Sequence, residues 1–142
     1  MLEVKPIQSK LEQEAACARC AMPYDADLLA YAATVEDVLV GVCQFTMRET
    51  GGSLRTLGSV ADRAPDFEAM FVLGRAALNF IDLCGVHFAT FDAPIRDEAE
   101  ERLIRAIGFT YDENGRWSVD LTHFFEHPCQ HHAPCPEDTP MR

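Results

Sequence analysis

The chain has 142 residues, of which 48% are hydrophobic and 25% are charged, a composition typical of one globular domain and not of a disordered chain. It carries 23 acidic against 12 basic residues, a net charge of -11. This surplus excludes nonspecific binding to nucleic acid or to an anionic membrane, since both need clustered Lys and Arg, and it favours cationic small molecules as ligands.

Membrane insertion and secretion are also not expected. No apolar run reaches the ~18 residues that a transmembrane helix needs. The start of the chain carries Glu3, Lys5 and Lys10 and lacks a signal-peptide core. We therefore expect a cytoplasmic protein, in which the six cysteines do not form a disulfide framework. Cys43 and Cys84 lie in apolar runs and are expected to be buried thiols.

Hydrophobic periodicity and turn residues predict alternating strands and helices. Ser9 and Glu12 form a capping box for the first helix, Gly51-Gly52 is expected to form a turn, and Asn114-Gly115 is typical of a hairpin. The expected elements, in chain order, are a strand at 2–7, a helix at 9–21, strands at 28–35, 38–47 and 54–60, a helix at 66–84, a strand at 86–91, a helix at 97–107 and strands at 109–111 and 117–121.

The order β-α-βββ-α-β-α-ββ predicts an α+β (mixed α/β) fold with a mostly antiparallel sheet. The helix at 66–84 is long enough to cross over the sheet, so the strands before and after it should be parallel neighbours. We expect residues 1–126 to form a single domain. Residues 127–142, rich in His, Cys and Pro, are expected to form a C-terminal tail.

Three stretches carry a resemblance to a known family: residues 35–41 (VEDVLVG), 57–60 (LGSV) and 102–109 (RLIRAIGF). Together with the element order, they resemble the hairpin, the fourth strand and the last helix of the GNAT (Gcn5-related N-acetyltransferase) fold. The resemblance implies that the fourth and fifth strands are parallel and fork apart. It also implies an N-acyltransferase that moves an acetyl or other acyl group from acyl-CoA to an amine of a small molecule, and the net charge favours a cationic one.

The resemblance also implies where acetyl-CoA or another acyl-CoA would bind. Backbone groups near Val60 would contact the pantetheine arm, and Ala69 and Met70 lie in the segment 65–70 that aligns with the family's phosphate-binding loop. That loop is glycine-rich in the family because backbone N–H groups must approach the pyrophosphate closely.

This segment departs from the family pattern, because it lacks glycine and places Asp66 and Glu68 where phosphate would sit. A rival alignment puts Gly74-Arg75 in the loop, at the expense of a turn of helix. Ile104 occupies the position of a tyrosine that protonates the leaving thiolate in many members. The sequence names no catalytic residue, and the alternative function is a catalytically degenerate GNAT-fold binding or dimerisation module.

A zinc site is a weaker hypothesis for the role of the cysteines. Cys17 and Cys20 could ligate zinc together with Cys129, Cys135 or His127, since zinc takes four Cys or His ligands. Both Cys17 and Cys20, however, lie on a predicted helix at a spacing that often faces the core. We therefore expect ordinary thiols and no bound metal.

Four other positions have an ordinary structural interpretation or a possible role in binding or assembly. His87 is expected to be a core residue of its strand, and His123 to lie on the surface. Tyr111 could line a substrate cleft. Exposure of Phe124-Phe125 would mark a contact in a homodimer.

Overall fold

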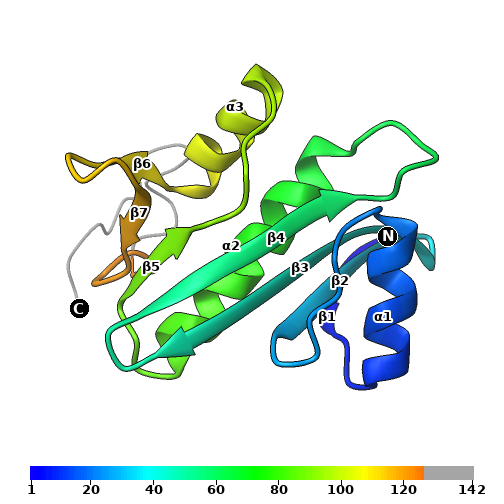
Figure 1. The fold of residues 1–142 in the computed structure, drawn as a ribbon, viewed down its shortest axis with the longest axis horizontal. Coiled ribbons are helices and arrows are strands. Elements are labelled where there is room, and N and C mark those ends of the chain that lie inside the picture. Colours follow the sequence, from blue (N-terminus) through cyan, green and yellow to red (C-terminus); the bar gives the residue numbers. More distant parts are fainter. Residues whose placement is uncertain (127–142) are drawn as a thin grey trace.

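The computed structural model describes residues 1–126, which form a seven-stranded mixed sheet and three helices (Figure 1). The predicted element order and the α+β class are confirmed. The tail predicted at 127–142 lies outside the described residues. The elements are β1 (Leu2–Pro6), α1 (Lys10–Arg19), β2 (Leu29–Val35), β3 (Val38–Arg48), β4 (Gly51–Ser59), α2 (Phe67–Leu83), β5 (Phe88–Phe91), α3 (Glu98–Ile107), β6 (Thr110–Tyr111) and β7 (Trp117–Asp120).

Each helix begins at a side chain that satisfies a free N–H of its first turn. The carboxylate of Asp66 accepts a hydrogen bond from the backbone N–H of Ala69 at 3.0 Å, and Ser9 and Asp97 cap α1 and α3 in the same way. Gly108 ends α3 with a φ of 134°, a conformation that residues with a Cβ rarely adopt.

The sheet has the strand order β1-β2-β3-β4-β5-β7-β6, and every neighbouring pair is antiparallel except β4 and β5. The crossover through α2 makes this pair parallel, as the sequence predicted. The parallel ladder is short, and its three register pairs are Gly52 with Ala89, Ser53 with Thr90, and Leu54 with Phe91.

Helices cover both faces of the strands β1 to β4 (Figure 1). On one face, α2 buries Leu73, Leu78 and Ile81 in the main core with Phe45 and Leu54 of the sheet. On the other face, α1 forms a smaller cluster that includes Cys17, Cys20, Val42 and Val60. Within residues 1–126, no helix is long and apolar enough to cross a bilayer.

Three expectations of the sequence analysis were wrong. Gly51 and Gly52 do not form the turn but begin β4, because the close approach of α2 needs a strand residue without a side chain at position 52. His87 precedes β5 and is exposed, where it contacts Asp82 at 2.6 Å. Cys84, expected to be buried, is exposed at the C-cap of α2.

The contact between Gly52 and α2 gives a test of this packing. A Cβ at Gly52 would lie 2.7 Å from Cδ1 and 2.9 Å from Cγ2 of Ile81, so Gly52→Ala should lower the free energy of unfolding by about 1–3 kcal/mol. Ile81→Ala alone should cost about 2–5 kcal/mol through the cavity it leaves. Urea unfolding of the double variant should show a loss smaller than the sum of the two; an additive loss would contradict the contact.

Candidate functional site

The pairing of β4 with β5 stops halfway along β4 and opens a fork. Beyond the pair formed by Leu54 and Phe91, one last backbone hydrogen bond joins the N–H of Asp92 to the carbonyl of Leu54 at 2.8 Å. Strand β4 continues to Ser59, whereas the chain after β5 turns away toward α3. Arg55 is an extra residue in β4, a bulge that bends the strand at the same level.

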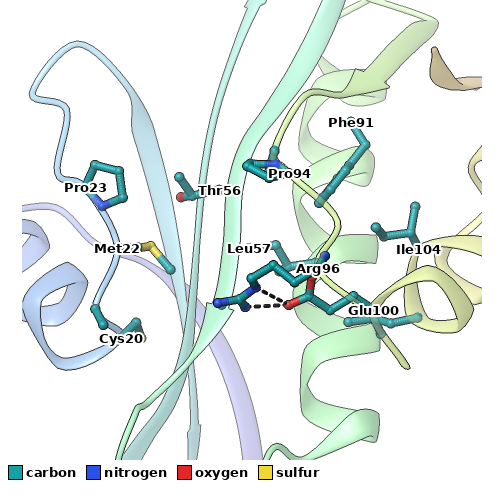
Figure 2. A pocket seen from close by; sticks show the side chains of 14 residues that line it. Cys20, Met22, Pro23, Thr56, Leu57, Phe91, Pro94, Arg96, Glu100 and Ile104 are labelled. Carbon is teal, nitrogen blue, oxygen red and sulfur yellow. Dashed lines mark hydrogen bonds and ion pairs between the residues drawn. The ribbon is translucent and has the colours of Figure 1, made fainter. Parts of the chain in front are cut away.

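A cavity of about 200 Å³ lies in this fork (Figure 2). Residues 56–58 of β4 form its floor, the segment 20–23 after α1 forms one wall, and the β5–α3 connection with one face of α3 forms the other. Figure 2 shows Met22 on one side and Ile104 on the other, with Leu57 between them. The lining of the cavity is mainly apolar, as expected of a site for a small organic ligand.

The wall formed by residues 20–23 is in close contact with the floor at Gly58. A Cβ at Gly58 would lie 2.8 Å from the terminal methyl group of Met22. Glycine therefore allows the Met22 side chain to lie against β4, and a larger residue would push this wall outward or close the cavity.

A buried amide network holds the same wall in place. The side chain of Gln44 donates to the carbonyl of Pro23 at 2.8 Å and to the hydroxyl of Thr56 at 3.1 Å. Its carbonyl accepts from Gln13 at 2.9 Å and from the N–H of Asp25 at 3.2 Å. Because unpaired polar groups are costly when buried, this network fixes the loop after α1 relative to the cavity floor.

The charged side chains at the cavity are Arg96 and Glu100, which form an ion pair (Figure 2). The Glu100 carboxylate accepts hydrogen bonds from the backbone N–H of Arg96 at 2.7 Å and from its Nε at 2.9 Å, and it also contacts Nη2. The hydrogen bonds and the negative charge of Glu100 raise the pKa of Arg96 above its usual value. The guanidinium is therefore charged, oriented and accessible.

Cys20 also lines the cavity but is not a nucleophile there. Its side chain is buried, and this burial, with a smaller contribution from Cys17, raises the pKa of the thiol to about 11. The thiol is protonated at neutral pH, whereas the thiolate is the reactive form. Over residues 1–126, no group of three His, Cys, Asp or Glu side chains is arranged to hold a metal ion. The other zinc candidates, Cys129, Cys135 and His127, lie outside the described residues.

None of the three residues predicted to bind the cofactor, Val60, Ala69 and Met70, lines the cavity. Val60 is buried under α1, and its N–H donates to the carbonyl of Val40 at 3.0 Å. The side chains of Ala69 and Met70 are buried beneath the first turn of α2, and the N–H groups of both donate to Asp66.

The start of α2 settles the alignment of this segment. Because α2 begins at Phe67, the rival alignment with Gly74-Arg75 in the loop is wrong. Gly74 packs against Ile107, and Arg75 donates to the carbonyl of Ile107 at 2.6 Å. The start of α2 therefore carries Asp66 at the N-cap and Glu68 in the first turn.

Other residues singled out in the sequence have clear places. Ile104 lines the cavity, as its position on the last helix suggested. Tyr111 instead lies on the β6–β7 hairpin, with its ring 5.2 Å from that of Trp117. His123 is exposed as expected, and Phe124 and Phe125 are half-buried against the core.

The comparisons with known proteins establish the fold. No protein-family model matches the sequence, and neither does any curated protein. Among solved structures, the ribosomal-protein-S18-alanine N-acetyltransferase of Escherichia coli is similar over 85% of this chain and 94% of its own, with a TM-score of 0.65 and 12% identity. The spermidine N-acetyltransferase of Vibrio cholerae is similar over 89% of this chain and 97% of its own, with a TM-score of 0.67 and 10% identity.

A third similar structure was solved with coenzyme A. The PaiA N-acetyltransferase of Thermoplasma acidophilum matches over 84% of this chain and 99% of its own, with a TM-score of 0.64 and 10% identity. Residues 1–126 thus have the fold of the GNAT acetyltransferases, as the sequence resemblance implied.

The buried amide network predicts a stability effect that is specific to position 44. Gln44→Leu would leave the Pro23 carbonyl and the Asp25 N–H without this partner and would remove one of the acceptors of the Gln13 amide, so it should lower the free energy of unfolding by about 2–3 kcal/mol. Gln8→Leu, at an exposed position, is the matched control. Equal urea midpoints for the two variants would contradict the role of the network.

A second prediction concerns Asp92 at the root of the fork. Burial alone would raise its pKa, but hydrogen bonds from Ser53, Thr90 and Arg116 together lower this pKa below its ordinary value of 3.8. Asp92 therefore contributes stability that is complete above pH 3.8 and is lost as the pH falls through the lower folded-state pKa.

Replacement of Asp92 by Asn should remove this acid-dependent part of the stability. Unfolding free energies measured between about pH 5 and about pH 2 should fall less steeply for Asp92→Asn than for the parent chain. Asp62→Asn, in an exposed loop, should leave the slope unchanged. The same slope for Asp92→Asn as for the parent would show that the hydrogen bonds do not favour the ionised form.

Proposed function

We propose that this chain is an N-acyltransferase that binds acetyl-CoA or another acyl-CoA in the fork between β4 and β5. The cavity in the fork is the observation that carries the proposal, because it opens a narrow, mainly apolar slot beside residues 56–58. The fold similarity to acetyltransferases, one of them solved with coenzyme A, supports it. The pantetheine arm would run along β4 toward Val60.

The cavity can promote acyl transfer by holding two reactants together. The neutral amine nitrogen attacks the thioester carbonyl carbon and gives up one proton, the carbon–sulfur bond breaks, and the leaving thiolate takes up a proton, so that an amide and free CoA are formed. Orientation of the two reactants accounts for a large part of such a rate enhancement. Among the side chains that line the cavity, Glu100 is paired with Arg96, the Cys20 thiol is protonated, and Ile104 cannot donate a proton. The proton transfers would therefore run through water.

The acceptor in this proposal is a small, cationic amine. The net charge of -11 attracts cations, and the Vibrio cholerae protein of similar fold is named for spermidine. Neither observation selects one amine, so polyamines and simple primary amines are the first acceptors to test.

A second candidate function is a catalytically degenerate GNAT-fold module that binds a ligand or a second copy of itself without turnover. The observation that favours it is the N-terminus of α2, where the carboxylates of Asp66 and Glu68 would oppose a phosphate. The N-terminus of a helix normally attracts anions, and here the capping carboxylate already occupies it.

Thermal unfolding with and without ligand tests the proposal. Acetyl-CoA and free CoA at about 1 mM should raise the melting temperature by mass action. Ala93→Phe should fill the cavity and abolish the shift, whereas Ala26→Phe, an exposed loop position, should retain it. A parent chain whose melting temperature neither ligand moves would overturn the proposal.

Thiol release separates the two candidates. An enzyme should liberate CoA thiol from acetyl-CoA in an amine-dependent manner, and Ala93→Phe should lose this activity. Ligand-induced stabilisation without thiol release from any amine would favour the binding module, and light scattering would then report whether it forms a dimer.

A further inference from the structure

The phosphates of the proposed ligand are negatively charged, and the floor of the fork offers them no cationic partner. Coenzyme A carries a pyrophosphate and a further phosphate, and these groups need free N–H donors or cationic side chains close to the site. In this chain the start of α2 presents Asp66 and Glu68, and the loop before it adds Asp62 and one basic residue, Arg63. The residues of this segment therefore do not fit a phosphate, although the cavity fits the arm.

The cation that lines the cavity is Arg96. It belongs to the β5–α3 connection, and the exposed fraction of its side chain is 74%. In Figure 2 its side chain extends toward the β4 side of the cavity, with the carboxylate of Glu100 beside the guanidinium. A ligand arm lying along β4 would pass this group.

The geometry of the ion pair makes Arg96 ready to exchange partners. Glu100 binds the backbone N–H and the guanidinium of Arg96 at once, and thereby fixes where the guanidinium points. Ion pairs this exposed contribute little net stability. A phosphate, which accepts two parallel hydrogen bonds from arginine, can replace the carboxylate without large loss.

We propose that Arg96 is the phosphate-binding residue of this chain and that Glu100 is its exchangeable counterion in the absence of ligand. This inference rests on the proposed function and deepens it. Residues 62–68 contain three acidic residues and one basic residue, Arg63, so this segment has no net positive charge. Arg96 supplies that charge from the opposite side of the fork. Glu100 then has two effects: it orients Arg96, and it competes with the phosphate.

Two ligands separate the contribution of phosphate from that of the arm. Acetyl-CoA carries the phosphates, and S-acetylpantetheine has the same arm and thioester without them. Arg96→Gln should weaken the binding of acetyl-CoA roughly tenfold, as measured by titration calorimetry. It should leave the affinity for S-acetylpantetheine within about twofold. Arg102→Gln, at an exposed position of α3, is the matched control and should change neither.

The competing role of Glu100 gives a result of opposite sign. Glu100→Gln removes the negative charge that competes with phosphate, so acetyl-CoA should bind several-fold more tightly. The salt dependence gives a second readout, because screening weakens a charge pair. The slope of log affinity against log salt should be shallower for Arg96→Gln than for the parent chain. The salt slope of acetyl-CoA binding tests the role of Arg96 even where S-acetylpantetheine binds too weakly to measure.

The outcomes distinguish this inference from the proposed function. The inference is overturned if Arg96→Gln binds acetyl-CoA with unchanged affinity and salt slope, or if it weakens both ligands equally. It is also overturned if Arg63→Gln, in the loop before α2, produces the loss instead. If the parent chain binds neither acetyl-CoA nor S-acetylpantetheine, the proposed function itself is wrong.

Discussion

The end of the β4–β5 ladder is the constraint on which the site depends. Two features of the chain after Phe91 stop the pairing. Asp92 is held by Ser53, Thr90 and Arg116, so its carboxylate stays at the last rung. Two residues later, Pro94 lacks an N–H and cannot extend a ladder. Strand β4 therefore continues alone, and the space beside it becomes the cavity.

Much of the fold could be predicted from local signals. The caps at Ser9, Asp66 and Asp97 mark the starts of all three helices, because each carries the side chain that its first turn needs. The hairpin around Asn114-Gly115 followed from its turn residues. The parallel neighbours followed from the length of one helix. These signals act within a few residues, which is the range that a sequence pattern shows.

Local patterns failed where a distant element changed the environment. Gln44 is a polar residue between Cys43 and Phe45 in the alternating pattern of β3, yet it is fully buried because α1 covers its face of the sheet. Gly52 resembled a turn residue, and its contact with Ile81 comes from α2. His87 resembled a core position because it follows Val86, but the strand begins one residue after it.

The candidate site was less predictable than the fold. The position of Ile104 and the fork could be inferred from the resemblance, but the wall at residues 20–23 could not. That wall depends on Gln13 meeting Gln44, two side chains far apart in the sequence. The pair formed by Arg96 and Glu100 has the ordinary spacing of a surface ion pair, and its place at the cavity emerges only from the fork.

The short ladder has a mechanical consequence. Strands β1 to β4 are joined by long antiparallel ladders, whereas β5, β7 and β6 are attached to them through three residue pairs. The sheet therefore consists of two plates joined at a narrow seam. Apart from this seam, the α3 side of the fork is joined to the rest through α2, where Gly74 packs against Ile107 and Arg75 donates to the carbonyl of Ile107. The width of the fork therefore depends on this contact between helices as well as on backbone pairing.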